Sequence, residues 1–328
     1  MEERTARILN MVVRSHIHSA QAVPSAVIAK QIGVSSATVR GELASLEQQG
    51  YLHQPHTSAG RVPTLKGYRV YARKSIPPKR LPKAQKQYIL SHLQAVRGEA
   101  LWQQVASLSA QLSGYAVLVS LPTDDSLLTL EVHLSALSSN RLLAVAVLET
   151  GLIRQVMLDL DPTPTDRALR EAESSLRQLA LTVGDMPVAL EDIASRAEDE
   201  VARTFRALAK NWSLMHPPRM FTEGLKNLLD EPESSDPSFV RAAVERLEQP
   251  IDANPSQMPE IHTSDLDSNL EHALAIVLEE AFGLVKARFS LGTNQGELLL
   301  LGPTRMRYSE ALMVAQGVSE TVVTTLAS

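Results

Sequence analysis

The 328-residue sequence contains no cysteine. Disulfide bonds and thiol catalysis are therefore excluded, and a reducing compartment, the cytoplasm, suits the chain. No apolar run reaches the roughly 20 residues that a membrane-spanning helix needs, and the N-terminal segment lacks the layout of a secretory signal. Aromatic residues are scarce at 4%, so we expect cores of Leu, Val, Ile and Ala. These absences predict a cytoplasmic protein with no membrane partner.

Acidic residues are missing from one long stretch, between Glu47 and Glu99. That stretch holds ten basic residues: Arg61, Lys66, Arg69, Arg73, Lys74, Lys79, Arg80, Lys83, Lys86 and Arg97. Residues 1–86 carry 14 Lys and Arg against 4 Asp and Glu, a formal charge of +10, whereas the remainder carries 18 against 33, or -15. A basic N-terminal module joined to an acidic body, in a chain long enough for two or three domains, indicates a nucleic-acid partner for the module.

The first 50 residues have the pattern of a helix-turn-helix. Apolar residues at helical spacing predict a helix over 3–19, and Pro24 suits the first turn of a second, short helix. Gly33 is expected to end that helix, and Ser35 or Ser36 to cap a third one. Two short helices joined by a Gly-containing turn are typical of DNA-binding modules, although many other helical hairpins share the pattern.

The two faces of the third predicted helix differ in character. Val39, Leu43 and Leu46 lie within one narrow sector and are expected to face the core. The opposite face is small and polar and carries one cation; its residues are Ala37, Arg40, Gly41, Ala44 and Gln48, flanked by Thr38 and Ser45. Such a face can enter a major groove, with Arg40 reading a base, or it can be an ordinary solvated surface.

Two short extended pieces follow, at 51–53 and 61–63, around a turn that contains Thr57 and Ser58. They predict a wing whose hydroxyls donate hydrogen bonds to phosphate oxygens. The next predicted helix carries Lys66, Arg69 and Arg73 on one stripe. A basic stripe is commonly just solvated, but the lack of interleaved acids favours phosphate contacts here.

The acidic part of the chain predicts an α+β domain. After a proline-rich linker from Ser75, a helix is expected over 85–113. Four strands in an antiparallel meander are expected at 115–121, 127–137, 141–149 and 152–160, followed by helices at 165–182 and 188–215. Further strands and a last helix over 309–326 complete the chain, which implies one α+β domain with an insertion near 216–269.

Several dense motifs resemble one protein family. SSATVR, GYL, PHTSAGRVPT and GYRVY lie within 35–71, EGLKNLLDEPE lies at 223–233, and LGPTRMRYSEAL lies at 301–312. On these motifs the chain resembles the HrcA family of heat-inducible transcription repressors. The strands between the motifs match the family only in general character.

The resemblance implies an α+β multidomain protein. It would have a winged helix-turn-helix domain at 1–75, a basic linker and the start of a connecting helix at 76–99, a GAF-like α+β domain at 100–215 and 270–328, and an inserted dimerisation segment at 216–269. It also implies a homodimer that binds double-stranded operator DNA, an inverted repeat of the CIRCE type ahead of chaperone genes. A GroE-type chaperonin is the implied partner that keeps such a repressor active, and heat stress releases the DNA.

The DNA-binding residues are carried over by motif and by charge. The resemblance places Ser35, Ser36, Thr38 and Arg40 in the groove, and His56, Thr57, Ser58 and Arg61 in the wing; the basic stripe adds Lys66 and Arg69. Gly41 stands where the family's motif usually has Asn after the Arg, and glycine has no side chain with which to contact a base.

Other chemistry is disfavoured by the sequence. There is no G-x-S-x-G nucleophile elbow, no P-loop and no dinucleotide fingerprint, and the histidines lack carboxylates at ligand spacing. We therefore expect no enzyme activity, cofactor or metal. The alternative left open is a ligand-gated winged-helix regulator of metabolic genes that senses a small molecule through its GAF-like domain.

Overall fold

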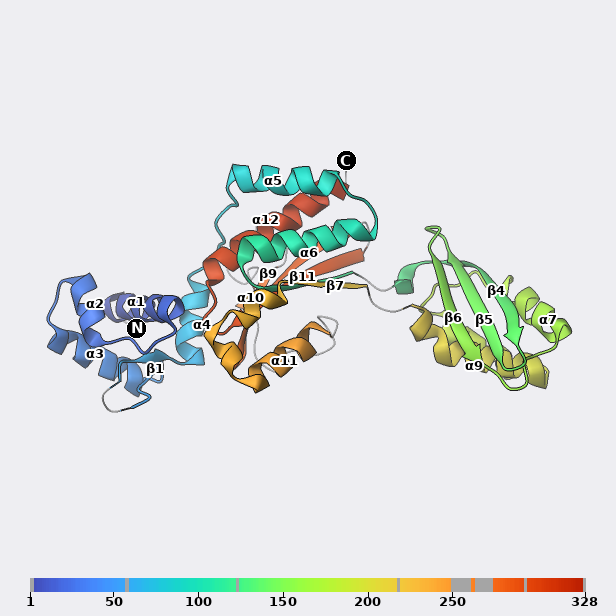
Figure 1. Cartoon of the computed structure of the whole chain (residues 1–328), viewed down its shortest axis with the longest axis horizontal. Coiled ribbons are helices and arrows are strands. Elements are labelled where there is room, and N and C mark those ends of the chain that lie inside the picture. Colours follow the sequence, from blue (N-terminus) through green and yellow to red (C-terminus); the bar gives the residue numbers. More distant parts are fainter. Residues whose placement is uncertain are drawn as a thin grey trace. The chain divides into compact units, whose positions relative to one another are not determined.

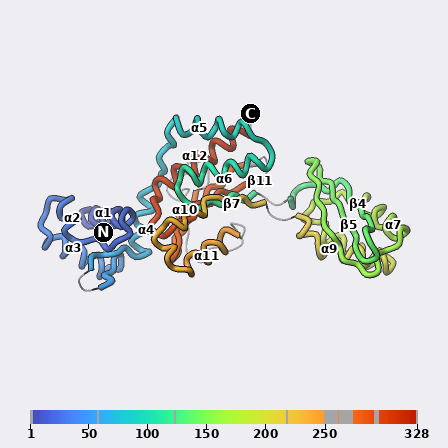
Figure 2. The backbone as a smooth tube through the Cα atoms, viewed as in Figure 1, coloured from blue at the N-terminus to red at the C-terminus, as the bar shows by residue number. Residues whose placement is uncertain are grey.

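The computed structural model describes residues 3–56, 59–121, 124–216, 219–248, 261–262, 274–291 and 294–326. Two compact units divide the chain: the first comprises Met1–Leu121 and Met220–Ser328, and the second comprises Pro122–Arg219. The backbone therefore leaves the first unit, passes through the whole of the second, and returns to finish the first, as the colours in Figure 2 show.

The first unit begins with a winged helix-turn-helix. Helices α1 (Glu3–Ser19), α2 (Ser25–Ile32) and α3 (Ser36–Gln48) precede a two-stranded antiparallel sheet, β1 (Leu52–His53) and β2 (Val62–Pro63), and then α4 (Leu65–Arg73). These helix boundaries agree closely with the periodicity of the sequence. Buried aliphatic side chains from α1, α2 and α3 form the shared core, for example Ile8, Ile28 and Leu46.

A six-stranded antiparallel sheet forms the centre of the rest of this unit. Its strand order is β7-β3-β11-β10-β9-β8. The strands are β7 (Met220–Glu223), β3 (Ala116–Ser120), β11 (Asn294–Pro303), β10 (Phe282–Leu291), β9 (Leu274–Leu278) and β8 (Ile261–His262). In the sequence β3 precedes the second unit and β7 follows it. These two strands are neighbours in the sheet, so the second unit is inserted between two adjacent strands.

Helices cover both faces of this sheet (Figure 1). On one face, Val117, Leu300 and their neighbours pack against α6 (Glu99–Ser113) and α12 (Tyr308–Leu326), with α5 (Lys83–Gln94) lying against α12. On the other face, Leu118 and Leu299 pack against α10 (Leu225–Leu229) and α11 (Pro237–Leu247). Burial on both faces explains why these strands read as continuous apolar runs.

The second unit is a three-stranded antiparallel sheet with helices on one face. The strands are β4 (Thr129–Ser138), β5 (Arg141–Leu148) and β6 (Ile153–Asp159), and the helices are α7 (Asp166–Leu176), α8 (Met186–Ala194) and α9 (Asp199–Met215). Its core is separate from that of the first unit and includes Leu142, Leu158 and Phe205. Alternation along β5 places Leu142, Ala144, Ala146 and Leu148 in this core.

Two local expectations from the sequence differ from the structure. The predicted four-stranded meander contains only β4, β5 and β6, because β3 pairs with β7 and β11 in the other sheet. The single helix expected over 85–113 is two helices, α5 and α6, separated at Gly98, which has a φ of 62°. α5 ends at Gln94, and Gly98 is the residue that precedes α6. A positive φ is readily adopted by glycine and lies outside the helical region, so one continuous helix cannot pass through Gly98.

The compact units also differ from the expected domain boundaries. The segment that is structurally separate is 122–219, not 216–269. The described part of 216–269 contributes β7, α10, α11 and β8 to the six-stranded sheet and its cover. The segment 76–99, expected to be a basic linker and the start of a connecting helix, contains α5, which packs on α12. These contacts join residues far apart in the sequence, which composition does not reveal.

Within the first unit, Arg305 joins the winged helix to the α+β domain. Its side chain is only 10% exposed and forms ion pairs with Glu231 and Glu233, with 2.7 Å between Arg305 Nε and Glu233 Oε1. Its remaining nitrogen, Nη1, donates to the carbonyl of Ile17 at 3.2 Å, near the C-terminus of α1. A cation at this end of a helix also interacts favourably with the helix dipole.

Beside this ion-pair cluster, Tyr68 of α4 lies 2.6 Å from His16 of α1, measured from the phenol oxygen to Nδ1. Burial, followed by the positive charge of Arg305, lowers the pKa of His16 from 6.5 to about 4, with His53 adding to the effect and Glu233 opposing it. His16 is therefore neutral at neutral pH, and its Nδ1 can accept the hydrogen bond that the Tyr68 hydroxyl donates.

This environment predicts an acid-sensitive fold. Between about pH 6.5 and pH 4 the unfolded chain binds a proton at His16 that the folded chain does not, so the free energy of unfolding should fall as the pH falls through this range. Urea unfolding at several pH values measures this loss. His16→Gln should show a smaller loss than the wild type, whereas His18→Gln, at an exposed position of the same helix, should match the wild type. Identical slopes for all three proteins would contradict the expectation.

Candidate nucleic-acid interface

The turn between α2 and α3 is built by Gly33 and Ser35. Gly33 has a φ of 77° and its N–H donates to the Ala29 carbonyl at 2.9 Å, which ends α2. Ser35 caps α3: its Oγ accepts from the Thr38 N–H at 3.1 Å and lies 2.8 Å from the Thr38 hydroxyl. Ser36 Oγ lies 2.9 Å from Ser25 Oγ, which fixes α3 against α2. The predicted groove residues at this end of α3 thus first of all hold the helix in place.

The outward face of α3 is the one expected from the sequence. Val39, Leu43 and Leu46 are buried, whereas the other face is exposed and consists of Ala37, Thr38, Arg40, Gly41, Ala44 and Gln48. A Cβ atom added at Gly41 would meet nothing within 4 Å, so this face is open and shallow around Arg40. Small side chains beside one guanidinium allow a helix to approach base edges closely.

The acidic residues of α3 are both drawn away from this face. Glu42 accepts a hydrogen bond from the Thr5 hydroxyl at 3.0 Å and lies 3.7 Å from the Arg4 guanidinium, both on α1. Glu47 pairs with Arg61 at 2.9 Å. Their negative charges are thus partly neutralised on the flanks of the helix, which leaves Arg40 to set the charge of its exposed face.

Glu47 also organises the base of the wing. Besides its ion pair with Arg61, its Oε1 accepts from the backbone N–H of Gln54 at 3.1 Å. The Gln54 side chain in turn donates to the carbonyl of Ala59 at 2.9 Å. One carboxylate of α3 therefore fixes both ends of the wing relative to the helix. This role could not be predicted from the sequence, because a lone acid in a basic region has no pattern that assigns its partner.

The predicted wing residues have different surroundings. His56 is exposed, and Thr57 and Ser58 lie outside the described residues. The side chain of Arg61 is only 18% exposed, and its guanidinium is engaged by Glu47. Its backbone pairs with that of Val23 through two hydrogen bonds of 2.9 Å, which attach the wing to the loop before α2. Arg61 thus has a structural contact in addition to the phosphate contact predicted for it.

The two residues of α4 that are predicted to bind phosphate are also engaged with the protein itself. Lys66 Nζ donates to the carbonyl of Gln49 at 2.9 Å, at the C-terminus of α3, and lies 4.4 Å from the centre of the Tyr51 ring. Arg69 is half-buried on α4. Among the described residues predicted to contact DNA, the exposed ones are Ser35, Thr38, Arg40, His56 and Lys66. Of those on α3, Arg40 has the longest side chain.

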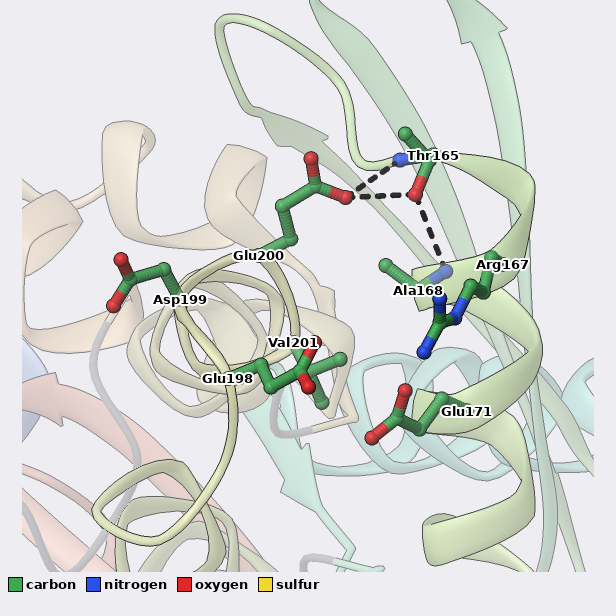
Figure 3. A pocket seen from close by; sticks show the side chains of 8 residues that line it. All are labelled: Thr165, Arg167, Ala168, Glu171, Glu198, Asp199, Glu200 and Val201. Carbon is green, nitrogen blue, oxygen red and sulfur yellow. Dashed lines mark hydrogen bonds between the residues drawn. The ribbon is translucent and has the colours of Figure 1, made fainter.

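Two polar sites in the second unit have structural roles. A groove of about 590 Å³ lies between the first turns of α7 and α9, and its lining includes four carboxylates and a single cation, Arg167 (Figure 3). There Glu200 accepts hydrogen bonds from the N–H and hydroxyl of Thr165 at 3.1 and 2.8 Å, which lower the pKa of Glu200 and tie α9 to the cap of α7. The acidic lining makes this groove unsuitable for nucleic acid.

The second polar site connects the beginning and end of this unit. Asp124 is 3% exposed, pairs with Arg154 at 2.7 Å and lies 3.4 Å from His216 Nδ1. Burial alone would raise the pKa of Asp124, but the hydrogen bond and charge of Arg154 outweigh it and lower the pKa. Since Asp124 and His216 lie near the two chain connections, this cluster holds the two ends of the unit together.

Among the described residues no group of three or more His, Asp or Glu side chains is placed to hold a metal ion. Within the same ranges, every helix is too short or too polar to span a bilayer. A winged helix with a cation on the open face of α3, joined to an α+β domain, defines a DNA-binding transcription regulator.

Comparisons with known proteins identify the family. The model described as "HrcA protein C terminal domain" matches residues 99–312. A heat-inducible transcription repressor HrcA from Moorella thermoacetica is 30% identical over 340 residues, covering 99% of this chain and 98% of that protein. The HrcA of Brevibacillus brevis is 28% identical over 337 residues, covering 98% of this chain and 96% of the relative. The chain belongs to the HrcA family of heat-inducible transcription repressors.

One solved structure supports the fold. A crystal structure described only as that of a hypothetical protein matches with a TM-score of 0.58 at 21% identity, covering 99% of each chain. The α+β fold class with an N-terminal winged helix-turn-helix and a GAF-like domain, expected from the sequence, is confirmed. The protein is a transcriptional repressor of heat-shock genes and binds DNA, and its family is not a class of enzymes.

Proposed function

We propose that the protein represses chaperone genes by binding, as a homodimer, to an inverted-repeat operator of the CIRCE type. A GroE-type chaperonin maintains the DNA-binding form, and heat releases the operator. The observation that carries the DNA-binding part is the exposed face of α3, on which Arg40 stands among small residues while Glu42 and Glu47 are paired elsewhere. In a two-fold dimer, each α3 would read one half-site in the major groove.

A gel-shift titration tests this function directly. The full-length protein should shift a CIRCE inverted repeat and leave a scrambled duplex of the same composition unshifted at moderate salt. Addition of GroE-type chaperonin should increase the fraction of active protein without changing the position of the specific complex. An equal affinity for both duplexes, with and without chaperonin, would contradict sequence-specific operator binding.

Arg40 is the residue that we expect to contact a base, with its guanidinium bidentate to a guanine. Arg40→Ala should weaken operator binding by about 1–3 kcal/mol, which is roughly five- to 150-fold, and should relax specificity at one base pair. Fluorescence anisotropy with operator variants measures both effects. Arg7→Ala, which removes an exposed cation of α1, is the control. An Arg40→Ala protein with unchanged affinity for operator and scrambled DNA would remove the base-reading role.

The second unit offers a surface for the proposed homodimer. The helix-free face of its sheet carries Ile153, which is 65% exposed, and Met157, which is 44% exposed. These residues lie opposite Val147 and Leu143 of β5 and so share a face with them, whereas Leu142 and Leu158 point into the core. Exposed apolar side chains on neighbouring strands, with polar residues such as Gln155 among them, are typical of a protein–protein interface. We assign dimerisation to this face of 122–219 in preference to 216–269.

Charges introduced on this face should separate the protomers. Ile153→Glu combined with Met157→Glu should convert a dimer into a monomer, because burial of two unpaired carboxylates outweighs the apolar contact. Light scattering coupled to size exclusion measures the mass. Val188→Glu with Leu214→Glu, at positions 75% and 68% exposed elsewhere in the unit, is the matched control and should remain dimeric. A dimer that persists in the first variant would place the interface elsewhere.

A further inference from the structure

A groove of about 550 Å³ lies where the winged helix meets the α+β domain of the first unit. Its walls come from three places: the second half of α1, the segment from the end of α4 to Lys79, and the first turns of α12. The lining contains no residue of α3 or of the wing. A molecule in this groove would therefore contact both domains and leave the DNA-reading face open.

The groove is strongly cationic. It is lined by four Lys and Arg side chains, one histidine and a single carboxylate, which are Arg14, Lys74, Lys79, Arg307, His18 and Glu310. Glu310 is paired with Arg307 at 3.1 Å. In the described part of the chain, no carboxylate lies within ion-pair distance of Arg14, Lys74 or Lys79, all of which are exposed. Like charges gathered in a concave site repel one another and attract an anion.

The inner surface of the groove is apolar, with one unsatisfied acceptor. Ile17, Tyr71 and Met313 provide hydrophobic and aromatic contact. Asn10 also lines the groove, and its Oδ1 is buried without a hydrogen-bond partner among the described residues. A buried acceptor without a partner is costly, and a ligand that donates an N–H group would satisfy it.

From this combination we propose that the groove binds a phosphate-bearing anion of nucleotide size. The cations contact the phosphates, the Tyr71 ring provides a surface for a base, and Asn10 Oδ1 accepts from an amino group of that base. The volume of the groove is within the range of small-ligand sites. The phosphate can come from a free nucleotide or from a DNA backbone; the Asn10 acceptor and the Tyr71 ring beside the cations favour the free nucleotide.

Calorimetry on the full-length protein tests the site with two probes, ATP and inorganic pyrophosphate, in the absence of metal ions. Arg14→Gln with Lys74→Gln should weaken both probes by at least about tenfold, because two charge-assisted contacts are lost. Arg7→Gln with Lys83→Gln removes the same charge at exposed positions outside the groove and should leave both affinities unchanged. Asn10→Ala should weaken ATP but not pyrophosphate, since only the base reaches it.

A second experiment measures how the operator affinity of each variant depends on salt concentration. Only this experiment rests on the proposed function. If neither probe binds but Arg14→Gln with Lys74→Gln flattens the salt slope by about two units more than the control pair, the phosphate is that of the DNA backbone. If neither probe binds and the slopes of both variant pairs agree, the site does not exist. Probe binding that is insensitive to Arg14 and Lys74 would also overturn the proposal.

Discussion

Replacement of Arg305 by methionine should destabilise the first unit by about 3 kcal/mol. The substitution keeps most of the side-chain volume but removes the charge that Glu231 and Glu233 share. These carboxylates are 24% and 32% exposed, so they would remain close together, partly desolvated and without a cation. The Ile17 carbonyl would also lose its donor. Removal of one partner of a buried ion pair costs more than the pair contributes as a whole.

The two tryptophans allow this effect to be measured in one unit at a time. Trp102 lies on α6 of the first unit and Trp212 on α9 of the second. In a Trp212→Phe background, tryptophan fluorescence during urea unfolding reports the first unit alone. Arg305→Met should shift its midpoint downward, and unchanged unfolding of the first unit would contradict the role assigned to Arg305.

A compensated variant separates lost charge pairing from lost packing. Arg305→Met with Glu231→Gln and Glu233→Gln removes the unpaired charges together with the cation. We expect it to be more stable than Arg305→Met alone, because amides tolerate partial burial better than lone carboxylates. If the triple variant were instead less stable than the single one, packing of the guanidinium and not its charge would be the dominant contribution.

The parts of this fold that the sequence predicts well are local. The period of apolar residues located α1 and α3, and it correctly assigned Val39, Leu43 and Leu46 to the core side of α3. Gly33 marked the end of α2, and Ser35 marked the start of α3. These signals depend on residues a few positions apart, which lie on one helix with one buried and one exposed face.

The parts that the sequence did not predict depend on pairing between distant segments. The strand β3 looks like the first strand of a meander, but its partners lie about a hundred or more residues further along the chain. Both large sheets are antiparallel and rich in apolar residues, so the spacing of apolar residues along a strand does not show to which sheet the strand belongs. The sequence therefore predicted an insertion at 216–269, whereas the separate unit is 122–219. The position of β3, within the predicted 115–121, and its apolar character were correct, and its partners were not.

The candidate site shows the same division. Exposure of Arg40 follows from helix geometry and was predicted. The partners of the other cations were not predicted. Arg61 pairs with Glu47, Lys66 donates to a backbone carbonyl, and Arg305 pairs with Glu231 and Glu233. Charge patterning identifies a basic surface, but only the fold decides which cations face solvent and which bind the protein itself.

A methyl group at Gly60 should disrupt the attachment of the wing. The Cβ of Gly60→Ala would lie far inside van der Waals contact with the Val23 carbonyl and 2.7 Å from the nitrogen of Pro24. These are backbone atoms, so no side chain can rotate away. The two hydrogen bonds between Val23 and Arg61 would have to lengthen or break. We expect a loss of about 2–3 kcal/mol in the free energy of unfolding, the cost of overpacking a tight contact.

Gly41→Ala is the matched control because it adds the same methyl group in open space, with nothing within 4 Å. Inside α3, alanine should raise helix stability by up to about 1 kcal/mol. The same substitution should therefore change stability in opposite directions at two glycines of one domain, as measured by urea unfolding with Trp212→Phe. Gly60→Ala should also weaken operator binding, since the wing would no longer be held against Glu47 and α3. If Gly60→Ala matched the wild type in both stability and operator affinity, the wing would not depend on its contact with Val23.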